Sequence, residues 1–377
     1  MSQLACNALP PRNILVKRRQ VLSRELKNLG VDGLLVTDIL NVRYLTGFTG
    51  SSAQLLVTRN ELILMSDTRY TTQIEIECGD LTVDIRTAKE PVLTQVARQV
   101  ELAGICQLGV ESESMTRLFY SQLAEKLPKI ALVDTNALIL NQRAIKDAFE
   151  ISMIRQSLKV AEKAISVTIA ELTESQTEVE IARNLEYSIR KFGGEGCAFE
   201  PIVAVGPHAA LPHARPTQVC VTDWPFLLID WGAKFNGYAS DLTRIFVTGK
   251  ISAKLKRVYE CVLTAQQLAI QQIRPGRKTG EIDLIARTAI EEAGFGKYFG
   301  HGLGHGFGLQ IHEQPRLAPN DHTELKAGMV VTVEPGIYLP DWGGVRIEDD
   351  ILVTPSGYEI LSGLTRELEA CTVDMLA

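Results

Sequence analysis

A pattern of two helices followed by β-rich sequence occurs twice in this chain, and it limits the possible folds more than any other feature. In the first copy, apolar residues at intervals of three or four form one stripe from Ile151 to Leu172, and Thr177-Glu-Val-Glu180 has the form of a capping box that opens a second helix. About 100 residues later, a helix is expected over 253–273 and another opens at Thr279. The repetition predicts one domain of two similar halves, each a pair of helices with a sheet.

The sequence before this duplicated region predicts a separate, smaller domain. Leucines from Leu15 to Leu29 recur at helical spacing, Gly30 follows as a C-cap, and residues 33–37 have the pattern of a short buried strand. Two further apolar runs, 54–58 and 61–65, flank Arg59-Asn60 and predict a hairpin. We therefore expect a mixed α/β (α+β) protein with one domain over 1–142 and the duplicated domain over 143–377.

Composition excludes several classes of protein. The 377 residues are 45% hydrophobic and 22% charged, which excludes a disordered chain. The net charge of -6 disfavours a nucleic-acid binder, and no apolar run approaches the ~20 residues that span a bilayer. The first residues lack the order of a signal peptide, and the seven cysteines are scattered, which is typical of free thiols in a reducing compartment. We expect a cytoplasmic protein that binds neither nucleic acid nor membrane.

Two aspartates are placed together by a predicted hairpin. Asn236-Gly237 lies between strand-like runs and is the strongest short hairpin signal, because a type I′ turn needs positive φ at both residues. A two-residue loop pairs Phe235 with Tyr238, and counting back makes Asp230 and Asp241 diagonal neighbours, within ~7–8 Å at the backbone. Such anions repel unless one carboxyl is protonated or a cation is bound between them.

All six histidines of the chain lie between His208 and His322, so imidazole chemistry belongs to its C-terminal half. Three of them, His301, His305 and His312, fall in a segment with glycine at every second position from 300 to 308. In an extended chain these glycines lie on one face and permit the close approach of another backbone or a ligand. The repeat lacks the frame of a dinucleotide-binding loop.

Two later strands carry four further ionisable residues. Glu334 ends the strand 330–334 before Pro-Gly, and Arg346, Glu348 and Asp350 share one face of the strand 343–353. Taken alone, Arg346 and Glu348 are typical of a salt-bridged solvent face. Taken with the other segments, one imidazole and four carboxylates suit two divalent metals; oxygen ligands favour Mn, and imidazole also admits Fe, Co and Zn. Two metals ~3.5–4 Å apart can share a hydroxide nucleophile, which is a hydrolase arrangement.

The segments that carry these residues resemble the pita-bread metallopeptidases, which include aminopeptidase P, prolidase and, more distantly, methionine aminopeptidase. The resemblance extends upstream through 199–213 and Arg143-Ala-Ile-Lys-Asp147, and into the first domain at 41–50 and 67–70. The catalytic motifs are Asp230-Trp-Gly-Ala, Ser240-Asp-Leu-Thr-Arg244, Gly304-His-Gly-Phe-Gly-Leu-Gln-Ile-His-Glu313, Val333-Glu-Pro-Gly-Ile-Tyr338 and Val345-Arg-Ile-Glu-Asp349. This likeness implies a creatinase-like N-terminal domain followed by a pita-bread catalytic domain.

The resemblance also implies a reaction, namely hydrolysis of the Xaa-Pro bond in dipeptides or at the free N-terminus of peptides, by a metal-bridging hydroxide. The substrate is a peptide with proline at its second position. The active form in the family is usually a dimer or tetramer, and we expect a homodimer here. The implied metal ligands are Asp230, Asp241, His305, Glu334 and Glu348, with Asp241 and Glu348 bridging. Glu334 also serves as general base, His213 stabilises the oxyanion, His312 contacts the peptide, His301 lines the proline pocket, and Arg346 orients a carboxylate or meets substrate. His208 and His322 match no role and are expected at the surface.

Other functions on this fold stay open. A creatinase-like amidinohydrolase or a lyase uses the same scaffold, although creatinase-like members lack the metal ligands. A non-enzymatic binding module is disfavoured by the intact ligand set and the acidic net charge. The sequence does not separate an aminopeptidase from a dipeptidase, and it leaves the native metal open.

Overall fold

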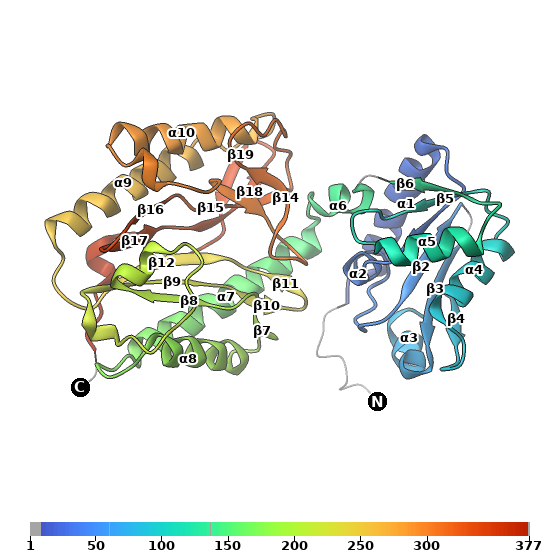
Figure 1. Ribbon diagram of the computed structural model, residues 1–377, viewed down its shortest axis with the longest axis horizontal. Coiled ribbons are helices and arrows are strands. Elements are labelled where there is room, and N and C mark those ends of the chain that lie inside the picture. The colour runs from blue at the N-terminus through green and yellow to red at the C-terminus, as the bar shows by residue number, and fades with distance from the viewer. Residues whose placement is uncertain (1–8, 60, 136, 376–377) are drawn as a thin grey trace. The chain divides into compact units, whose positions relative to one another are not determined.

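The computed structural model describes residues 9–59, 61–135 and 137–375. The chain forms two compact units, one up to Arg143 and one from Ala144 onward (Figure 1). Among the described residues, every helix is too short or too polar to cross a bilayer.

The first unit is built on a six-stranded sheet with the order β4-β3-β2-β1-β5-β6. The predicted hairpin is confirmed, since β2 and β3 pair antiparallel with Leu55 opposite Leu64. Gly30 ends the first helix at a φ of 73°, as a C-cap glycine does. The helices are α1 Arg12–Leu29, α2 Ile39–Thr46, α3 Thr71–Glu77, α4 Val92–Leu102, α5 Arg117–Lys126 and α6 Leu138–Arg143. The strands are β1 Gly33–Val36, β2 Gln54–Thr58, β3 Leu62–Asp67, β4 Thr82–Arg86, β5 Gln107–Val110 and β6 Ala131–Asp134.

The second unit contains the two predicted pairs of helices. These are α7 Ala148–Ala170 with α8 Glu178–Lys191, and α9 Ala253–Ile270 with α10 Thr279–Glu292. The capping box at Thr177 and Glu180 is present and begins α8 as expected, and Asp147 with Glu150 forms another at the start of α7. The second half differs locally: the hydroxyl of Thr279 donates to Asp321 Oδ1 at 3.0 Å instead of capping α10.

The strands of this unit form four small sheets between the helix pairs (Figure 1). Their orders are β11-β10-β7, β12-β9-β8, β14-β13-β15-β18-β19 and β16-β17. In sequence the strands are β7 Gly196–Cys197, β8 Ile202–Val205, β9 Phe226–Trp231, β10 Ala233–Phe235, β11 Tyr238–Ala239, β12 Leu242–Val247, β13 Gly304–Gly306, β14 Glu313–Leu317, β15 Val330–Val333, β16 Gly336–Leu339, β17 Gly343–Arg346, β18 Asp349–Thr354 and β19 Gly357–Ile360.

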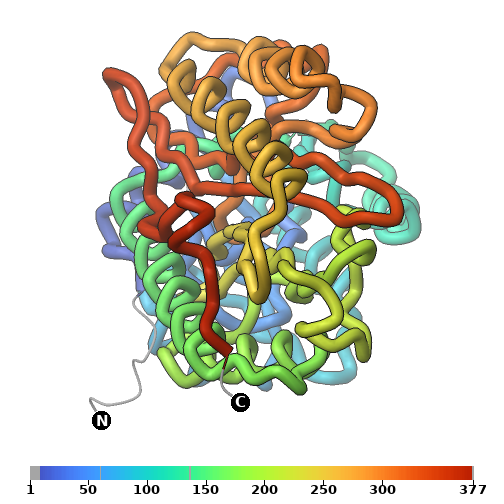
Figure 2. The backbone as a smooth tube through the Cα atoms, turned by 90° about the vertical axis from the view of Figure 1, so that its left-hand side faces the viewer, coloured from blue at the N-terminus to red at the C-terminus, as the bar shows by residue number. Residues whose placement is uncertain are grey.

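One hydrophobic core joins the halves. Leu228 and Ile245 from the first half, Val262 from α9, and Val331 and Ile351 from the second half belong to the same buried cluster. In Figure 1, α7 and α8 lie on one side of the strands and α9 and α10 on the other. The C-terminal segment then passes between α9 and α7 (Figure 2), where the backbone N–H of Gly363 donates to Glu162 and the hydroxyl of Tyr259 donates to the Arg366 carbonyl.

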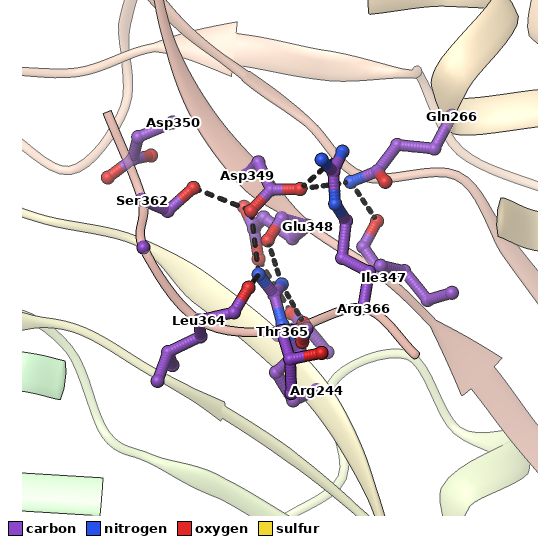
Figure 3. A network of polar contacts seen from close by, with 12 residues as sticks. Arg244, Gln266, Ile347, Glu348, Asp349, Asp350, Ser362, Leu364, Thr365 and Arg366 are labelled. Atoms are coloured by element: carbon purple, nitrogen blue, oxygen red, sulfur yellow. Dashed lines mark hydrogen bonds and ion pairs between the residues drawn. The ribbon is translucent and has the colours of Figure 1, made fainter. Parts of the chain in front are cut away.

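A buried ion pair fixes this C-terminal segment to the strands (Figure 3). Arg244 Nη2 lies 2.7 Å from Asp349 Oδ1, and both side chains are 1% exposed. The same guanidinium donates to the backbone carbonyls of Leu364, Thr365 and Glu348. The network therefore holds both the C-terminal segment and the backbone of Glu348.

Arg244→Met is expected to lower the free energy of unfolding by about 3–5 kcal/mol. The substitution removes the guanidinium and leaves the carboxylate of Asp349 buried without its cationic partner. Urea denaturation measures the change. Arg155→Met is the matched control, since the Arg155–Glu359 pair is 39% and 44% exposed and such pairs contribute at most about 1 kcal/mol. Equal losses in the two variants would contradict the importance of burial.

Candidate active site

The hairpin register predicted from Asn236-Gly237 is confirmed. Phe235 pairs with Tyr238, and the same register continues into β9 and β12, where Leu242 lies opposite Trp231. Asn236 and Gly237 have φ of 47° and 78°, as a type I′ turn requires. This register makes Asp230 and Asp241 diagonal neighbours.

Five side chains meet around one point, and we call Asp230, Asp241, His305, Glu334 and Glu348 the acidic cluster. Ligand atoms of Asp230, Asp241 and Glu348 all lie within 4.8 Å of one another, and the three residues are buried. His305 Nε2 lies 3.6 Å from Asp241 Oδ2 and 3.4 Å from Glu334 Oε1. The structure thus brings together every residue predicted as a metal ligand. The first and last of them, Asp230 and Glu348, are 118 positions apart in the sequence.

The electrostatics of the acidic cluster call for bound cations. Burial, and then the neighbouring charge of Glu348, raises the pKa of Asp241 well above its usual range. Burial also raises the pKa of Glu334 to about 8 and lowers the pKa of His305 to about 4. Among the described residues, the buried Oδ1 of Asp230 has no hydrogen-bond donor. These anions are therefore held together at an electrostatic cost that a cation would remove.

The tautomer of His305 gives a second sign of a cation site. Its Nδ1 lies 3.1 Å from the Gly306 carbonyl, which can only accept, so Nδ1 carries the proton. A neutral ring then directs the Nε2 lone pair toward the carboxylates of Asp241 and Glu334. Lone pairs that face each other across less than 4 Å are the arrangement of ligands around a metal ion. One imidazole and four carboxylates fit divalent ions such as Mn, Fe, Co or Zn.

Arg346 orients this cluster from within the core. Its Nη2 donates to Asp230 Oδ2 at 2.6 Å and its Nε donates to Thr243 Oγ1 at 3.1 Å. The Thr243 hydroxyl in turn donates to Glu348 Oε2 at 2.6 Å. Because Arg346 and Glu348 are 3% and 1% exposed, the alternative that they form a salt-bridged solvent face is excluded, and Arg346 instead contacts a carboxylate of the cluster.

Thr243 and Tyr338 are site residues that were not predicted. Thr243 lies directly opposite Asp230 in the β9–β12 ladder, so the hairpin count that placed the aspartates also contained this residue. Tyr338 folds over Gly336, where a Cβ atom would lie 2.4 Å from the Tyr338 hydroxyl oxygen. A glycine two positions before an aromatic residue on a strand is a local signal for such packing.

His301 has both ring nitrogens engaged. Arg346 Nη1 donates to the Tyr338 hydroxyl at 2.8 Å, so that hydroxyl donates its own proton to His301 Nε2, also at 2.8 Å. His301 Nδ1 lies 2.7 Å from the Gly302 carbonyl. Burial lowers the pKa of His301 to about 4, so the ring is neutral.

The glycine repeat is only partly extended. β13 covers Gly304–Gly306 alone, with a register shift between His305 and Gly306, so the five glycines do not all share one face of a single strand. The predicted close approach is confirmed at two positions. A Cβ on Gly304 would lie 2.1 Å from the Thr332 carbonyl oxygen, and one on Gly306 would lie 2.2 Å from that of Gln314.

Two exposed histidines flank the acidic cluster. The rings of His312 and His305 are 4.3 Å apart between centroids. His213 follows the short 3-10 helix Gly206–Ala210, and its neighbour Pro212 accepts a hydrogen bond from Arg346 Nη1 at 3.4 Å. Burial raises the pKa of Asp230, whereas the charges of Arg346, His213 and His312 act in the opposite direction, so all of these groups lie near that carboxylate.

The two remaining histidines differ from each other. His322 is exposed, as expected. The expectation that His208 lies at the surface is wrong, because its side chain is 19% exposed and its Nδ1 lies 2.9 Å from a carboxylate oxygen of the fully buried Glu178.

Comparisons with known proteins agree with this site. Residues 152–355 match the model of Metallopeptidase family M24, and residues 18–145 match the Creatinase/Prolidase N-terminal domain. An Xaa-Pro dipeptidase from Pyrococcus horikoshii is 38% identical over 338 residues, which are 90% of this chain and 94% of that protein. A Bacillus subtilis protein described as an uncharacterized peptidase is 36% identical over 340 residues, 90% of this chain and 96% of its own.

Solved structures give the same result. An Xaa-Pro dipeptidase from Bacillus anthracis has a TM-score of 0.90 at 35% identity, covering 94% of this chain and 99% of that one. An X-Pro aminopeptidase from Thermotoga maritima has a TM-score of 0.85 at 33% identity, covering 91% and 99%. The family resemblance seen in the motifs is confirmed. The chain is a peptidase that belongs to metallopeptidase family M24, with a creatinase/prolidase-type N-terminal domain before a pita-bread catalytic domain.

Proposed function

We propose that this peptidase hydrolyses the bond between an N-terminal residue and proline, in dipeptides, in longer peptides or in both. The observation that carries the proposal is the convergence of the acidic cluster, whose three buried carboxylates lie within 4.8 Å of one another. The similar proteins named Xaa-Pro dipeptidase and X-Pro aminopeptidase support the choice of substrate. We also propose a homodimer, which light scattering tests directly.

The acidic cluster would hold two divalent ions, with Mn as the first candidate and Co, Fe and Zn as alternatives. Asp230 would bind one ion, His305 the other, and Asp241 and Glu348 both, while Glu334 completes the set. When bound, such ions polarise a carbonyl and acidify a water molecule.

Glu334 is the carboxylate best placed to move protons. Its side chain is 17% exposed, compared with 12% for Asp230, 6% for Asp241 and 1% for Glu348. The Thr332 hydroxyl donates to Glu334 Oε1 at 3.2 Å and so orients the carboxylate. We assign Glu334 as the general base that takes a proton from the attacking water and returns it to the leaving prolyl nitrogen.

We assign each histidine around the cluster to a different part of the substrate. His213 and His312 are exposed and can donate to the scissile carbonyl and to the peptide backbone, so we assign His213 to the oxyanion. His301 has no free nitrogen, and Phe299 packs edge-on against it at 5.1 Å between centroids. This apolar ring suits a pyrrolidine, so we place the proline side chain against His301.

Turnover of three peptides tests the function. Protein loaded separately with Mn, Co, Fe or Zn is given Ala-Pro, Ala-Pro-Ala and Ala-Ala, and free alanine is measured. We expect cleavage of at least one proline peptide at more than about 10 times the rate of Ala-Ala. Comparison of Ala-Pro with Ala-Pro-Ala separates a dipeptidase from an aminopeptidase. If every metal form leaves both proline peptides intact, the proposal is rejected. Creatine and substrates of C–S lyases would then test the alternative functions on this fold.

Arg346→Lys is expected to lower kcat/KM by on the order of 100-fold, because one ammonium cannot reproduce the guanidinium contacts to Asp230, Thr243, Tyr338 and Pro212. Steady-state kinetics with Ala-Pro or Ala-Pro-Ala measures the loss. Arg257→Lys, at an exposed position of α9, is the control and should be unchanged. Full activity of the Arg346 variant would show that the orientation of Asp230 does not limit catalysis.

A further inference from the structure

A single buried carboxylate, away from the acidic cluster, holds both ends of the loop that carries His213. Glu178 is the first residue of α8 and its side chain is 0% exposed. Its Oε1 accepts a hydrogen bond from the Val205 N–H at 2.7 Å, and its Oε2 accepts from the Thr217 N–H at 2.8 Å and the Thr217 hydroxyl at 2.7 Å. His208 Nδ1 completes the set at 2.9 Å, and it carries the proton because a carboxylate only accepts.

The donors to Glu178 span the loop from its first residue to its last. Val205 ends β8, His208 lies in the 3-10 helix Gly206–Ala210, and Thr217 closes the loop four residues after His213. Between these anchors, the loop is also held by N–H donation from Leu211 to the His208 carbonyl and from Ala214 to the Leu211 carbonyl. His213 itself is exposed at the loop's centre.

The opposite side of this loop rests on glycines of β17. A Cβ on Gly344 would lie 1.9 Å from the Ala209 carbonyl oxygen, and one on Gly343 would lie 2.9 Å from that of Gly206. Arg346, on the same strand, donates to the Pro212 carbonyl. The loop is therefore fixed between Glu178 on one side and the strand that leads to Glu348 on the other, which sets the position of His213 relative to the acidic cluster.

We propose that Glu178 is a positioning residue for His213. The carboxylate is stabilised by its place at the N-terminus of α8 and by the four donors, so the loop keeps one conformation before substrate arrives. His213 then meets the scissile carbonyl without a cost of ordering the loop. The role of His213 in this inference rests on the proposed function. The anchoring of the loop by Glu178 is independent of that function.

Glu178→Gln tests the proposal, because it keeps the shape of the side chain but places an N–H₂ group against N–H and O–H donors. Glu180→Gln is the matched control, since Glu180 is exposed two positions later on the same helix, and among the described residues its side chain bonds with its cap residue Thr177 alone. We expect faster hydrogen–deuterium exchange within 205–217 in Glu178→Gln alone. We also expect its kcat/KM to fall by on the order of 10- to 100-fold, with Glu180→Gln unchanged.

A double-mutant cycle with His213→Ala distinguishes positioning from general destabilisation. If Glu178 acts through His213, Glu178→Gln has little further effect on kcat/KM in the His213→Ala background. The proposal would be overturned if the losses in kcat/KM caused by Glu178→Gln and His213→Ala multiplied in the double variant. Unchanged hydrogen–deuterium exchange within 205–217 in Glu178→Gln would also overturn it. Should Glu178→Gln fail to fold, Thr217→Val and His208→Leu each remove one side-chain donor and are subjected to the same cycle.

The outcomes also separate this inference from the proposed function. If the wild-type protein cleaves no Xaa-Pro peptide, the proposed function fails, and the exchange experiment still decides whether Glu178 holds the loop. If wild-type turnover is present but His213→Ala leaves it unchanged, the positioning of His213 is overturned while the Xaa-Pro activity stands.

Discussion

Asp241→Asn should abolish peptidase activity while leaving the protein folded. Asp241 touches both sides of the acidic cluster, since it lies within 4.8 Å of Asp230 and Glu348 and 3.6 Å from His305. An amide carries no charge and offers one oxygen, so it cannot neutralise two divalent ions. A metal that acts as Lewis acid contributes several kcal/mol to catalysis, and a loss of about 4 kcal/mol corresponds to roughly 1,000-fold in kcat.

The same variant should take up less metal, which elemental analysis after dialysis against Mn measures. Thermal unfolding checks that the fold is intact: without metal, the variant should be at least as stable as the wild type, because it removes one of the repelling carboxyls. Asp341→Asn is an isosteric control at an exposed turn, where the φ of 62° suits asparagine. Normal metal content and turnover in Asp241→Asn would rule out Asp241 as a bridging ligand.

Metal-free protein should lose stability as the pH rises from about 6.5 to about 8, and metal should abolish this loss. The pKa of Glu334 is raised to about 8, chiefly by burial, and those of Asp241 and Glu348 are raised for the same first reason. In this window the unfolded carboxyls have already lost their protons and the folded ones still hold theirs. The folded state binds more protons than the unfolded state, so stability falls as the pH rises, by about 1.4 kcal/mol per pH unit for each such group.

The histidines fix the lower limit of this window. Burial lowers the pKa values of His301 and His305 to about 4. Between pH 4 and about 6.5 these two rings therefore make the folded protein more stable as the pH rises, which offsets the loss of stability caused by the carboxyls. Above that range they no longer titrate. Chelator-treated protein should therefore melt roughly 5–10 °C lower at pH 8 than at pH 6.5, whereas saturating Mn gives a flat profile. A metal-free protein that becomes more stable over this range would contradict the buried, repelling cluster.

Much of the site could be predicted because its first part is local. Asn236-Gly237 dictates a two-residue turn, and the turn dictates which residues of β9 and β12 face each other, so the placement of Asp230 and Asp241 followed from counting. The capping box at Thr177 likewise marked the start of α8 from two residues three positions apart, Thr177 and Glu180. The order of the motifs supplied His305, Glu334 and Glu348.

The rest depends on contacts between distant segments, which no local pattern encodes. Read by its own strand, Arg346 alternates with apolar residues as a solvent-facing residue does. The family resemblance predicted a role for it at the site, but only the packing of β17 against β12 determines its contact with Thr243. His208 lies 30 positions from Glu178, and nothing near either residue indicates the other. The glycine repeat is compatible with an extended strand, and the register shift after His305, which interrupts that strand, has no signal in the spacing of the glycines.

The division of the acidic cluster between the two halves has a consequence for how the site forms. Asp230 and Asp241 belong to the first half, and His305, Glu334 and Glu348 to the second. Either half alone carries an incomplete set of ligands, so the cluster exists only when the two halves pack around their shared hydrophobic core. Assembly of the site is therefore coupled to folding of the whole catalytic domain.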